Sequence, residues 1–485
     1  MSLKFKAVSA LSWSLADKLI NQLGYLAVTV YLARLIGPES FGLIGMLAIF
    51  TLLADSVVSN GFSNALVQRS QQLTEDDACT VFWVNLGWGT LIYAVLFVAA
   101  PWIAQFYRQP ELIGVARVLF LVIIINAFSV VARAKLTIAV DFKSQAIANT
   151  SATVLSSALA ALLAQRGYGY WALIWLMVSK AVIASLGVWW FCRWLPRWRL
   201  SRASFTTLFG FGSKLMLAGS ITTVVDNLYA PLIGYFYNVS QVGFFTQAAN
   251  LSNYLSGFIS SSLQGVSYPI MTSIKDEHER LVSIFKQMIS VSMLVCLPLL
   301  SGFAAVANDV VLLLLGDAWR PTIPILIALS IARTVTPVSS INANMVNVVG
   351  RSDLFLKVSL SKIPIAITAL FLALPYGVEG LAWAMVCSSF IAFFINAWYP
   401  GKIFGFGGIA QLGVARPYIA ASAIMFTVVY FLPWGTSFVG LAGKIIFGTF
   451  VYVAMVWVMG DKFVRQLMQW VPLGIKALRA FVLSR

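Results

Sequence analysis

Residues 13–69 read WSLADKLINQLGYLAVTVYLARLIGPESFGLIGMLAIFTLLADSVVSNGFSNALVQR, two long apolar segments joined by a turn at Arg34–Ser40 (RLIGPES). Each segment is long enough to cross a bilayer, which needs about 20 mostly apolar residues. However, the first segment carries Asp17 and Lys18, and the second carries Asp55. Ionisable side chains at membrane depth are costly and usually face protein or water. We therefore predict that this hairpin lines the path of a transporter.

The rest of the chain is equally apolar. Of its 485 residues, 60% are hydrophobic and 10% are charged, whereas about 25% charged residues is usual in soluble domains. The apolar runs are continuous and do not alternate as the strands of a membrane barrel would. This composition predicts an all-α polytopic membrane protein. The first run continues past Asp17 and Lys18 to Ala33 without a cleavage pattern, so we predict a retained first helix and no signal peptide.

We predict about fourteen transmembrane helices. Their expected ranges are 10–33, 41–62, 79–100, 112–133, 146–164, 169–192, 208–235, 242–265, 284–306, 321–347, 355–375, 378–400, 416–433 and 438–459.

The distribution of basic residues predicts the orientation. With the N-terminus in the cytoplasm, 24 of the 33 Lys and Arg residues are cytoplasmic, Arg133 among them, and six, including Lys444, are in external loops. The other three, Lys18, Lys180 and Arg333, lie at membrane depth. Because cytoplasmic loops of membrane proteins are enriched in Lys and Arg, both termini are expected in the cytoplasm. The same rule explains the net charge of +16 without a nucleic-acid partner.

An internal repeat relates the first six helices to the next six. Phe41-Gly42 aligns with Val242-Gly243 at an offset of 201, and Tyr168-Gly169 aligns with Tyr376-Gly377 at an offset of 208. A weaker match relates residues 102–110 (WIAQFYRQP) to residues 312–321 (LLLLGDAWRP). Because each half has an even number of helices, the halves should have the same orientation, as in transporters built from parallel repeats.

The repeat predicts four regions. They are an N-lobe of helices 1–6 (residues 1–200), a C-lobe of helices 7–12 (201–402), helices 13–14 (403–460) and a basic amphipathic tail (461–485). The tail is expected to lie on the anionic cytoplasmic leaflet, and docking to a partner protein is the alternative. The most basic loop, residues 193–207 (RWLPRWRLSRASFTT), would join the two lobes.

Polar side chains form narrow stripes at helical spacing on five predicted helices. The stripes include Asp17, Lys18 and Asn21 in the first helix, Asp55 in the second, Asp226 and Asn227 in the seventh, Asn250, Asn253 and Gln264 in the eighth, and Arg333 and Asn344 in the tenth. The Ser and Thr residues of these stripes are expected to join helices by hydrogen bonds.

The ionisable residues of the stripes have different expected roles. Asp55, Asp226 and Arg333 are deep and far in sequence from an opposite charge, so we predict a functional role for them. Asp17 and Lys18 either form a local ion pair or line the cavity. Lys180, in the sixth helix, either pairs with an acid elsewhere or contacts a ligand.

The chain lacks the motifs of soluble catalytic sites. There is no GxxxxGK[ST], GxSxG or HExxH sequence, and His278 is the single histidine. The four cysteines, Cys79, Cys192, Cys296 and Cys387, have no metal-ligand spacing. We therefore expect no catalytic residue, metal site or bound cofactor. Transport would be driven by an ion gradient, by the membrane potential or by the gradient of the substrate itself.

Several motifs together resemble one family. They are residues 33–42 (ARLIGPESFG), Ala54-Asp55, Gly61, residues 65–69 (ALVQR), residues 314–321 (LLGDAWRP) and residues 349–356 (VGRSDLFL). Over essentially the whole chain, these motifs resemble bacterial polysaccharide exporters of the Wzx type, in the MOP flippase superfamily. The details are most similar to flippases for colanic acid and related exopolysaccharides.

The resemblance implies a substrate and a mechanism. Such a protein moves an oligosaccharide repeat unit on undecaprenyl diphosphate from the cytoplasmic to the periplasmic leaflet of the bacterial inner membrane, by alternating access of two lobes. The implied cavity cations are Lys18, Lys180 and Arg333, of which Lys18 and Arg333 would hold the diphosphate. Asp55 and Asp226, together with Asp17, would couple transport to H⁺ or Na⁺ or balance the cations. The amides would line a path for sugars: Asn21, Asn227, Asn250, Asn253, Gln264 and Asn344.

The expected partners are membrane lipids, the lipid-linked oligosaccharide, and a polysaccharide polymerase with its chain-length regulator. Two other functions are considered. A multidrug or cation antiporter of the same superfamily is disfavoured by the fourteen predicted helices and by the ARLIGPESFG stretch. A membrane polysaccharide polymerase is disfavoured because the predicted external loops are too short for a catalytic region.

Overall fold

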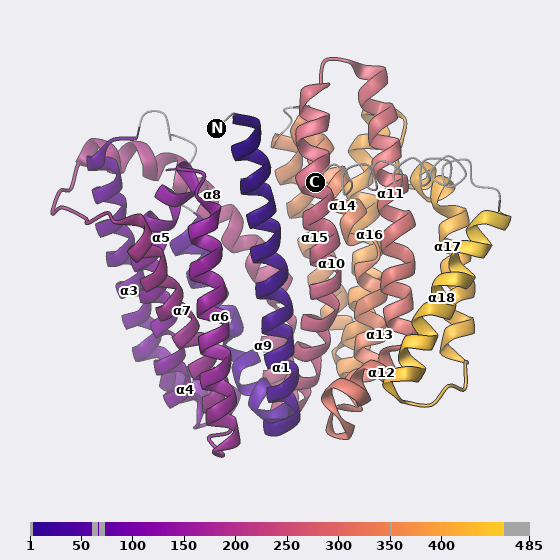
Figure 1. The fold of residues 1–485 in the computed structure, drawn as a ribbon, viewed down its shortest axis with the longest axis horizontal. Coiled ribbons are helices and arrows are strands. Elements are labelled where there is room, and N and C mark those ends of the chain that lie inside the picture. The colour runs from indigo at the N-terminus through magenta and orange to yellow at the C-terminus, as the bar shows by residue number, and fades with distance from the viewer. Residues whose placement is uncertain (1–2, 61–65, 67–72, 350–351, 460–485) are drawn as a thin grey trace, which may run out of the picture. The chain divides into compact units, whose positions relative to one another are not determined.

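The computed structural model describes residues 3–60, 66, 73–349 and 352–459 (Figure 1). These residues form helices and connecting turns, with no strand among them, so the all-α prediction is confirmed. The chain divides into two compact units, residues 1–247 and 248–485, which are described separately below. The lobe boundaries taken from the repeat remain a prediction. The predicted amphipathic tail at 461–485 lies outside the described residues.

Unit 1 is built from long helices that run along one another. In chain order they are α1 (Leu3–Asp55) with a π-helical end η1 (Ser56–Asn60), α3 (Glu75–Tyr107), α4 (Leu112–Leu119), α5 (Leu121–Ile138), α6 (Phe142–Gln165), α7 (Trp171–Cys192), α8 (Arg202–Asn227), α9 (Tyr229–Phe236) and the start of α10 (Val239–Ser273). The strongest packing joins α6 to α7 and α1 to α6.

The predicted hairpin at Arg34–Ser40 is present within α1. Its two arms meet at a kink where Gly37 has φ 73° and ψ 176°, which is not helical, and Pro38 follows directly. A residue with a side chain rarely adopts this positive φ, and proline removes a backbone donor, so the pair stops one helix and starts the next. In Figure 1 the indigo chain descends from the N-terminus along the first arm to this turn.

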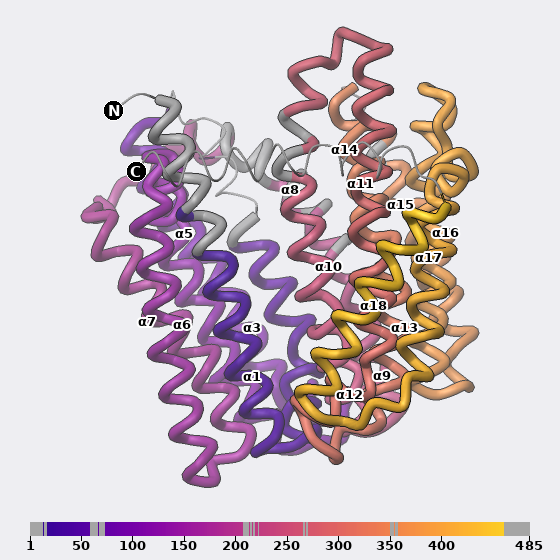
Figure 2. Tube along the Cα trace, turned by 45° about the vertical axis from the view of Figure 1, so that its right-hand side comes forward, coloured from indigo at the N-terminus to yellow at the C-terminus, as the bar shows by residue number. Residues whose placement is uncertain are grey.

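Unit 2 contains the remaining helices. They are the rest of α10, then α11 (His278–Ala305), α12 (Ala307–Val310), the turns η3 (Val311–Leu315) and η4 (Asp317–Trp319), α13 (Thr322–Arg333), α14 (Thr336–Val348), α15 (Ser352–Ala373), η5 (Leu374–Tyr376), α16 (Gly377–Phe404), α17 (Gly408–Tyr430) and α18 (Phe438–Val458). Figure 2 shows α17 and α18 packed side by side at the C-terminal end of this unit.

Ten helical segments of the described chain are long and apolar enough to cross a membrane. Two of them, residues 17–58 and 357–404, each cover two predicted spans. The seventh and eighth predicted helices correspond to α8 with α9 and to α10, which are not among the ten. The exact number of fourteen transmembrane helices therefore remains a prediction. The helical membrane architecture is confirmed.

Local backbone features occur in pairs at the spacing of the repeat. Arg108 and Gly316 are 208 residues apart and both have positive φ, 55° and 95°. Gly169 and Gly377 are also 208 residues apart, with φ of 54° and 76°. In addition, the fourth and tenth predicted helices are both interrupted, between α4 and α5 and between α13 and α14. Paired positive φ values and paired helix interruptions are expected of two repeated halves. The repeat remains a prediction.

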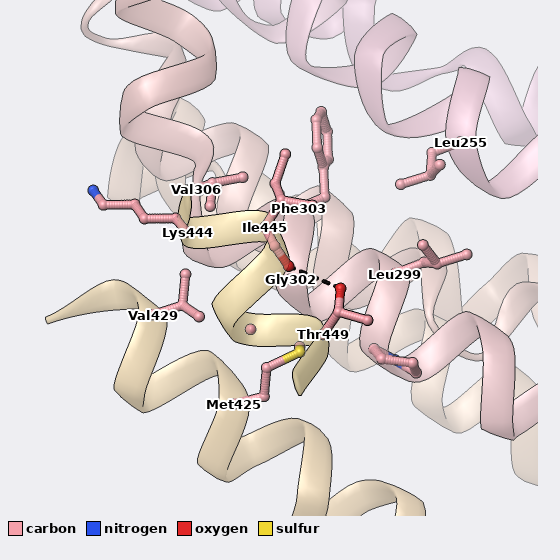
Figure 3. Close-up of a pocket in the computed structure, with 12 residues that line it drawn as sticks. Leu255, Leu299, Gly302, Phe303, Val306, Met425, Val429, Lys444, Ile445 and Thr449 are labelled. Atoms are coloured by element: carbon pink, nitrogen blue, oxygen red, sulfur yellow. Dashed lines mark hydrogen bonds between the residues drawn. The ribbon is translucent and has the colours of Figure 1, made fainter. Parts of the chain in front are cut away.

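A buried ion pair fixes α18 to α12 in unit 2. Lys444 Nζ lies 2.6 Å from Asp309 Oδ2, and the two side chains are 9% and 2% exposed. The prediction that Lys444 belongs to an external loop is wrong, because α18 already begins at Phe438. Figure 3 shows Lys444 beside Val306 at the edge of an apolar cavity of about 210 Å³. Burial of this charge requires the carboxylate, since an unpaired ion in an apolar interior is strongly destabilising.

Replacing Lys444 by methionine should therefore destabilise the protein. Removal of one partner from a buried pair costs about 3–5 kcal/mol, whereas apolar replacement of both partners is often neutral. We expect the thermal unfolding midpoint in detergent to fall for Lys444→Met and to recover in Lys444→Met with Asp309→Leu. Lys402→Met, at an exposed lysine of α16, is the control. An unchanged midpoint for Lys444→Met would contradict a stabilising pair.

Candidate functional site

The first polar cluster surrounds Asp17 in the first arm of α1. Asn21 Nδ2 donates to Asp17 Oδ1 at 2.6 Å, and Asn149 Nδ2 of α6 donates to Asp17 Oδ2 at 3.2 Å. Thr153, one turn further along α6, donates its hydroxyl to Asn21 Oδ1. The polar stripe of the first helix therefore faces a polar stripe on α6. Asp17 and Lys18 are predicted either to form a local ion pair or to line the cavity. Among the described residues no ion pair joins them, and Lys18 is exposed.

The second cluster surrounds Asp55, at the end of the other arm of α1. Asn126 Nδ2 of α5 donates to Asp55 Oδ1 at 3.3 Å. Two turns further along α5, Arg133 interacts electrostatically with both Asp55 and Asp17. Arg133 Nε also donates to Ser129 Oγ at 3.3 Å, which orients the guanidinium. A single half-buried cation is thus near enough to act electrostatically on the carboxylates of both arms.

Lys180 of α7 completes this arrangement. Its Nζ lies 4.8 Å from the centroid of the Tyr25 ring, a cation–π contact. Lys180 also interacts electrostatically with Asp17. The prediction that Lys180 pairs with an acid elsewhere agrees with this placement, and contact with a ligand remains a proposal.

We call Asp17, Asn21, Asp55, Arg133 and Lys180 the unit 1 network. Its side chains come from α1, α5 and α7, and amides of α5 and α6 hold its two carboxylates. Asp17, Arg133 and Lys180 are half-buried and Asp55 is exposed. The two positive and two negative charges balance, which lowers the desolvation cost of the half-buried groups. The network offers guanidinium and ammonium donors to an anion or to sugar hydroxyls, and carboxylates that can exchange a proton or bind a cation.

The other predicted residues of unit 1 are on α8. Asp226 is exposed, near the end of this helix. Asn227 Nδ2 donates to the carbonyl oxygen of Thr223 at 2.9 Å, within the same helix. Asn227 therefore bonds within its own helix.

In unit 2, Arg333 lies at a break in the tenth predicted helix. It is the last residue of α13, and α14 begins at Thr336 with Pro337 in its first turn. Thr334 Oγ donates to the carbonyl oxygen of Ile331 at 2.6 Å, which satisfies one of the groups freed by the break. Interrupted helices commonly form binding sites in transporters, because their ends present unpaired backbone groups. The sequence predicted Arg333 as functional but did not predict the break.

The predicted amides of unit 2 do not form one cluster. Within the described part of the chain, no hydrogen bond joins Asn250, Asn253, Gln264 and Asn344 to one another. A different amide pair is buried there: Asn342 Nδ2 donates to Gln411 Oε1 at 3.0 Å, and Gln411 Nε2 donates back at 2.8 Å. This reciprocal pair fixes α14 to α17 and is structural.

A close backbone contact joins the α1 turn to the start of α10, and both segments belong to unit 1. A Cβ atom at Gly42 would overlap the carbonyl oxygen of Val239, and a Cβ atom at Gly243 would overlap the carbonyl oxygen of Pro38. Gly42 and Gly243 are 201 residues apart, as are Pro38 and Val239. The contact is therefore reciprocal between positions that the repeat makes equivalent. We call these four residues the glycine contact.

Glu39 strengthens this contact. Ser240 Oγ donates to Glu39 Oε1 at 3.3 Å, and these two residues are again 201 apart. The backbones of the two segments are so close here that a side chain at Gly42 or Gly243 has no room. Only glycine at both positions allows this approach.

Comparison with known proteins identifies the family. The model of the polysaccharide biosynthesis protein family matches residues 31–324, more than half of the chain. The chain belongs to this family. Its relatives include the lipopolysaccharide biosynthesis protein WzxC of Escherichia coli, 25% identical over 75% of this chain and 74% of the relative. The teichuronic acid biosynthesis protein TuaB of Bacillus subtilis is 24% identical over 77% and 78%. The succinoglycan biosynthesis transport protein ExoT of Rhizobium meliloti is 26% identical over 68% and 66%.

Solved structures place this polysaccharide biosynthesis protein in a known fold. The lipid II flippase MurJ in an inward closed conformation has a TM-score of 0.76 at 12% identity, covering 95% of this chain and all of that one. An inward-facing multidrug transporter of the MATE family of the MOP superfamily has a TM-score of 0.61 at 17% identity, covering 86% and 99%. The resemblance to Wzx-type proteins, predicted from the motifs, is confirmed by the relative WzxC, and the two solved structures share the fold of this chain.

One member of the unit 1 network was missed in the sequence of this polysaccharide biosynthesis protein. Arg133 is counted with the 24 cytoplasmic basic residues in the prediction and has no predicted role there. The signal was available: Asn126, Ser129, Arg133 and Thr137 have the spacing i, i+3, i+7, i+11 of one helix face. The same holds for Asn149 and Thr153 of α6.

Proposed function

We propose that this polysaccharide biosynthesis protein is a flippase for oligosaccharide repeat units linked to undecaprenyl diphosphate. It would move them from the cytoplasmic to the periplasmic leaflet of the bacterial inner membrane, with both of its termini in the cytoplasm. The observation that carries the proposal is the family match, because the relatives named above act in the biosynthesis of different envelope polysaccharides and one is named a transport protein. The fold shared with a lipid II flippase supports the same class of substrate.

The charged groups suggest how a lipid diphosphate would be handled. Arginine suits phosphate because its guanidinium presents several donors in a fixed geometry. We propose that three cations of unit 1, Arg133, Lys180 and exposed Lys18, bind the diphosphate. Arg333 of unit 2 is a further candidate cation for it. The sugar hydroxyls would contact the amides of α10 and α14. Asp17, Asp55 and Asp226 would balance these cations or couple transport to H⁺ or Na⁺.

The glycine contact suggests how access is controlled. With the N-terminus in the cytoplasm, the turn at Arg34–Ser40 is external, so the contact closes the external end of the path. Opening toward the periplasm would require Gly42 to separate from Val239 and Gly243 to separate from Pro38. We propose that alternation between this closed contact and an open one is the transport cycle. A polysaccharide polymerase and a chain-length regulator would receive the product.

Alanine at two cations tests substrate binding. In a deletion strain complemented with Lys18→Ala or Arg333→Ala, we expect polysaccharide export to be blocked while the protein remains in the membrane. Export is measured as surface polysaccharide, and membrane content by immunoblot. Arg320→Ala, at an exposed residue paired with Asp317, is the matched control. Normal export from both variants would rule out these cations as the diphosphate site.

A drug antiporter is the second candidate, and the MATE-like fold is the observation that favours it. The two functions differ in the deletion strain. A flippase predicts lipid-linked repeat units accumulating on the cytoplasmic side and unchanged drug sensitivity. An antiporter predicts normal polysaccharide and increased drug sensitivity.

A further inference from the structure

The segment that follows α7, residues 193–201, is bound to the first turns of α3 in unit 1. The backbone N–H of Arg197 donates to Cys79 Sγ at 3.4 Å, and that of Ser201 donates to Thr80 Oγ1 at 2.9 Å. In return, Trp83 Nε1 donates to the carbonyl oxygen of Arg197 at 3.0 Å. These bonds hold a non-helical segment in a fixed place against α3. We call residues 193–201 the strap.

The acidic residues beside the strap are already engaged. Glu75 accepts from Lys135 and from Trp194 Nε1, both at 2.8 Å, and Lys135 Nζ also lies 4.3 Å from the Trp194 ring centroid. Asp76 pairs with Arg199 at 3.2 Å. Asp77 caps α3 by accepting from the backbone of Thr74.

Basic residues outnumber these acids. Five basic residues, Lys135, Arg193, Arg197, Arg199 and Arg202, are present where α3 contributes three acids in its first turn. Arg193, Arg197 and Arg202 are exposed. The surface at this end of α3 therefore has an excess of positive charge.

An apolar groove runs from this basic surface along α3. It has a volume of about 690 Å³ and extends from Trp83 to Ala94 on α3, with Trp198 and Leu200 of the strap at one end. From Trp83 to Ala94 the helix rises about 16 Å, close to half of a bilayer's hydrocarbon thickness. Trp198 is 76% exposed, as is common for tryptophan at a membrane interface. The groove thus has the length of one leaflet, with the arginines and Trp198 of the strap at one end.

We propose that this groove binds one anionic phospholipid, with an acyl chain along α3 and its phosphate at the arginines of the strap and Arg202. The positive end matches an anionic headgroup, and the apolar length matches an acyl chain. A folded protein partner would not require charge confined to one end of a leaflet-deep groove. With the orientation proposed above, the rim faces the cytoplasm, whose leaflet attracts basic segments in this way. The site is separate from the unit 1 network and does not depend on the transported substrate.

Gly87 gives a sharp test of the groove. A Cβ atom added there would meet no atom within 4 Å, so Gly87→Leu fills the groove without a clash in the fold. Gly413 of α17 is equally open and provides Gly413→Leu as the matched control. Ala94→Leu is a second filling variant in case Gly87→Leu does not fold. For the charge, Arg197→Gln with Arg202→Gln is compared with Arg280→Gln and Arg320→Gln, which remove two exposed arginines of unit 2.

Native mass spectrometry of the full chain in detergent, titrated with phosphatidylglycerol or phosphatidylcholine, measures the binding. We expect wild type to prefer phosphatidylglycerol. The double arginine variant should lose about fivefold in apparent affinity for each arginine, the ratio that corresponds to about 1 kcal/mol. A groove-filling variant should bind both lipids more weakly, and both controls should match wild type.

Three outcomes would overturn the proposal. They are equal binding of the two lipids by wild type, unchanged binding by the filling and arginine variants, and displacement of phosphatidylglycerol by an equimolar amount of undecaprenyl phosphate. The last would assign the groove to the substrate carrier. Equal unfolding midpoints for the variants and wild type establish that a loss of binding is local.

Discussion

Replacing Gly42 by valine is expected to abolish polysaccharide export without removing the protein from the membrane. The new side chain would overlap the carbonyl oxygen of Val239, and backbone cannot move aside as a flexible side chain can. Overpacking of this kind costs about 1–3 kcal/mol, enough to shift a two-state equilibrium about 5- to 150-fold against the closed contact. Gly243→Val should have the same effect, because its Cβ would overlap the carbonyl oxygen of Pro38.

Gly413→Val is the control for these variants. It places the same residue in helix α17, where the added Cβ meets no atom within 4 Å. The mechanism is tested by labelling: in a background without other cysteines, Ser40→Cys should react slowly with an external maleimide, since Ser40 is buried. Adding Gly42→Val should speed that reaction. Normal export from both glycine variants, or unchanged labelling, would show that the glycine contact does not gate the path.

Replacing Arg133 by glutamine is expected to stop export and to lower stability. Arg133 interacts electrostatically with both Asp17 and Asp55, so its loss leaves half-buried Asp17 and exposed Asp55 without that cation. Because the side chain is half-buried, we expect about 2 kcal/mol, less than the cost of breaking a fully buried pair. The measurements are surface polysaccharide and the unfolding midpoint in detergent. Arg166→Gln, at an exposed residue after α6, is the control.

A double variant separates charge balance from substrate contact. Arg133→Gln with Asp55→Asn removes both charges and should recover much of the stability. If Arg133 contacts the diphosphate, export should stay blocked in the double variant. Recovery of export together with stability would show that Arg133 only neutralises the carboxylates.

Much of the fold could be predicted because its signals are local. The turn between the arms of α1 follows from Gly37 and Pro38, and each long apolar run marks a helix. The equivalence of Gly42 and Gly243 was visible in the alignment of Phe41-Gly42 with Val242-Gly243. Its meaning was not, because the sequence does not show that one copy touches the other.

Long-range interactions could not be predicted from local hydropathy. Arg133 is at the end of a predicted helix, and its electrostatic interactions with Asp17 and Asp55 join residues far apart in the sequence. Lys444 was counted with the external loops, although the predicted helix at 438–459 contains it. Its partner, Asp309, is 135 residues away and could not be identified from local spacing.

Reconstitution of the purified protein tests the proposed flippase activity most directly. Liposomes are prepared with the lipid-linked oligosaccharide of the source strain in both leaflets, and an enzyme that cleaves the sugar is added outside. Without protein, the oligosaccharide of the inner leaflet should remain protected. With wild type it should be consumed completely, and with Arg133→Gln it should stay protected. Protection of the inner-leaflet oligosaccharide in liposomes that contain folded wild type, across imposed H⁺ and Na⁺ gradients, would contradict the proposed function.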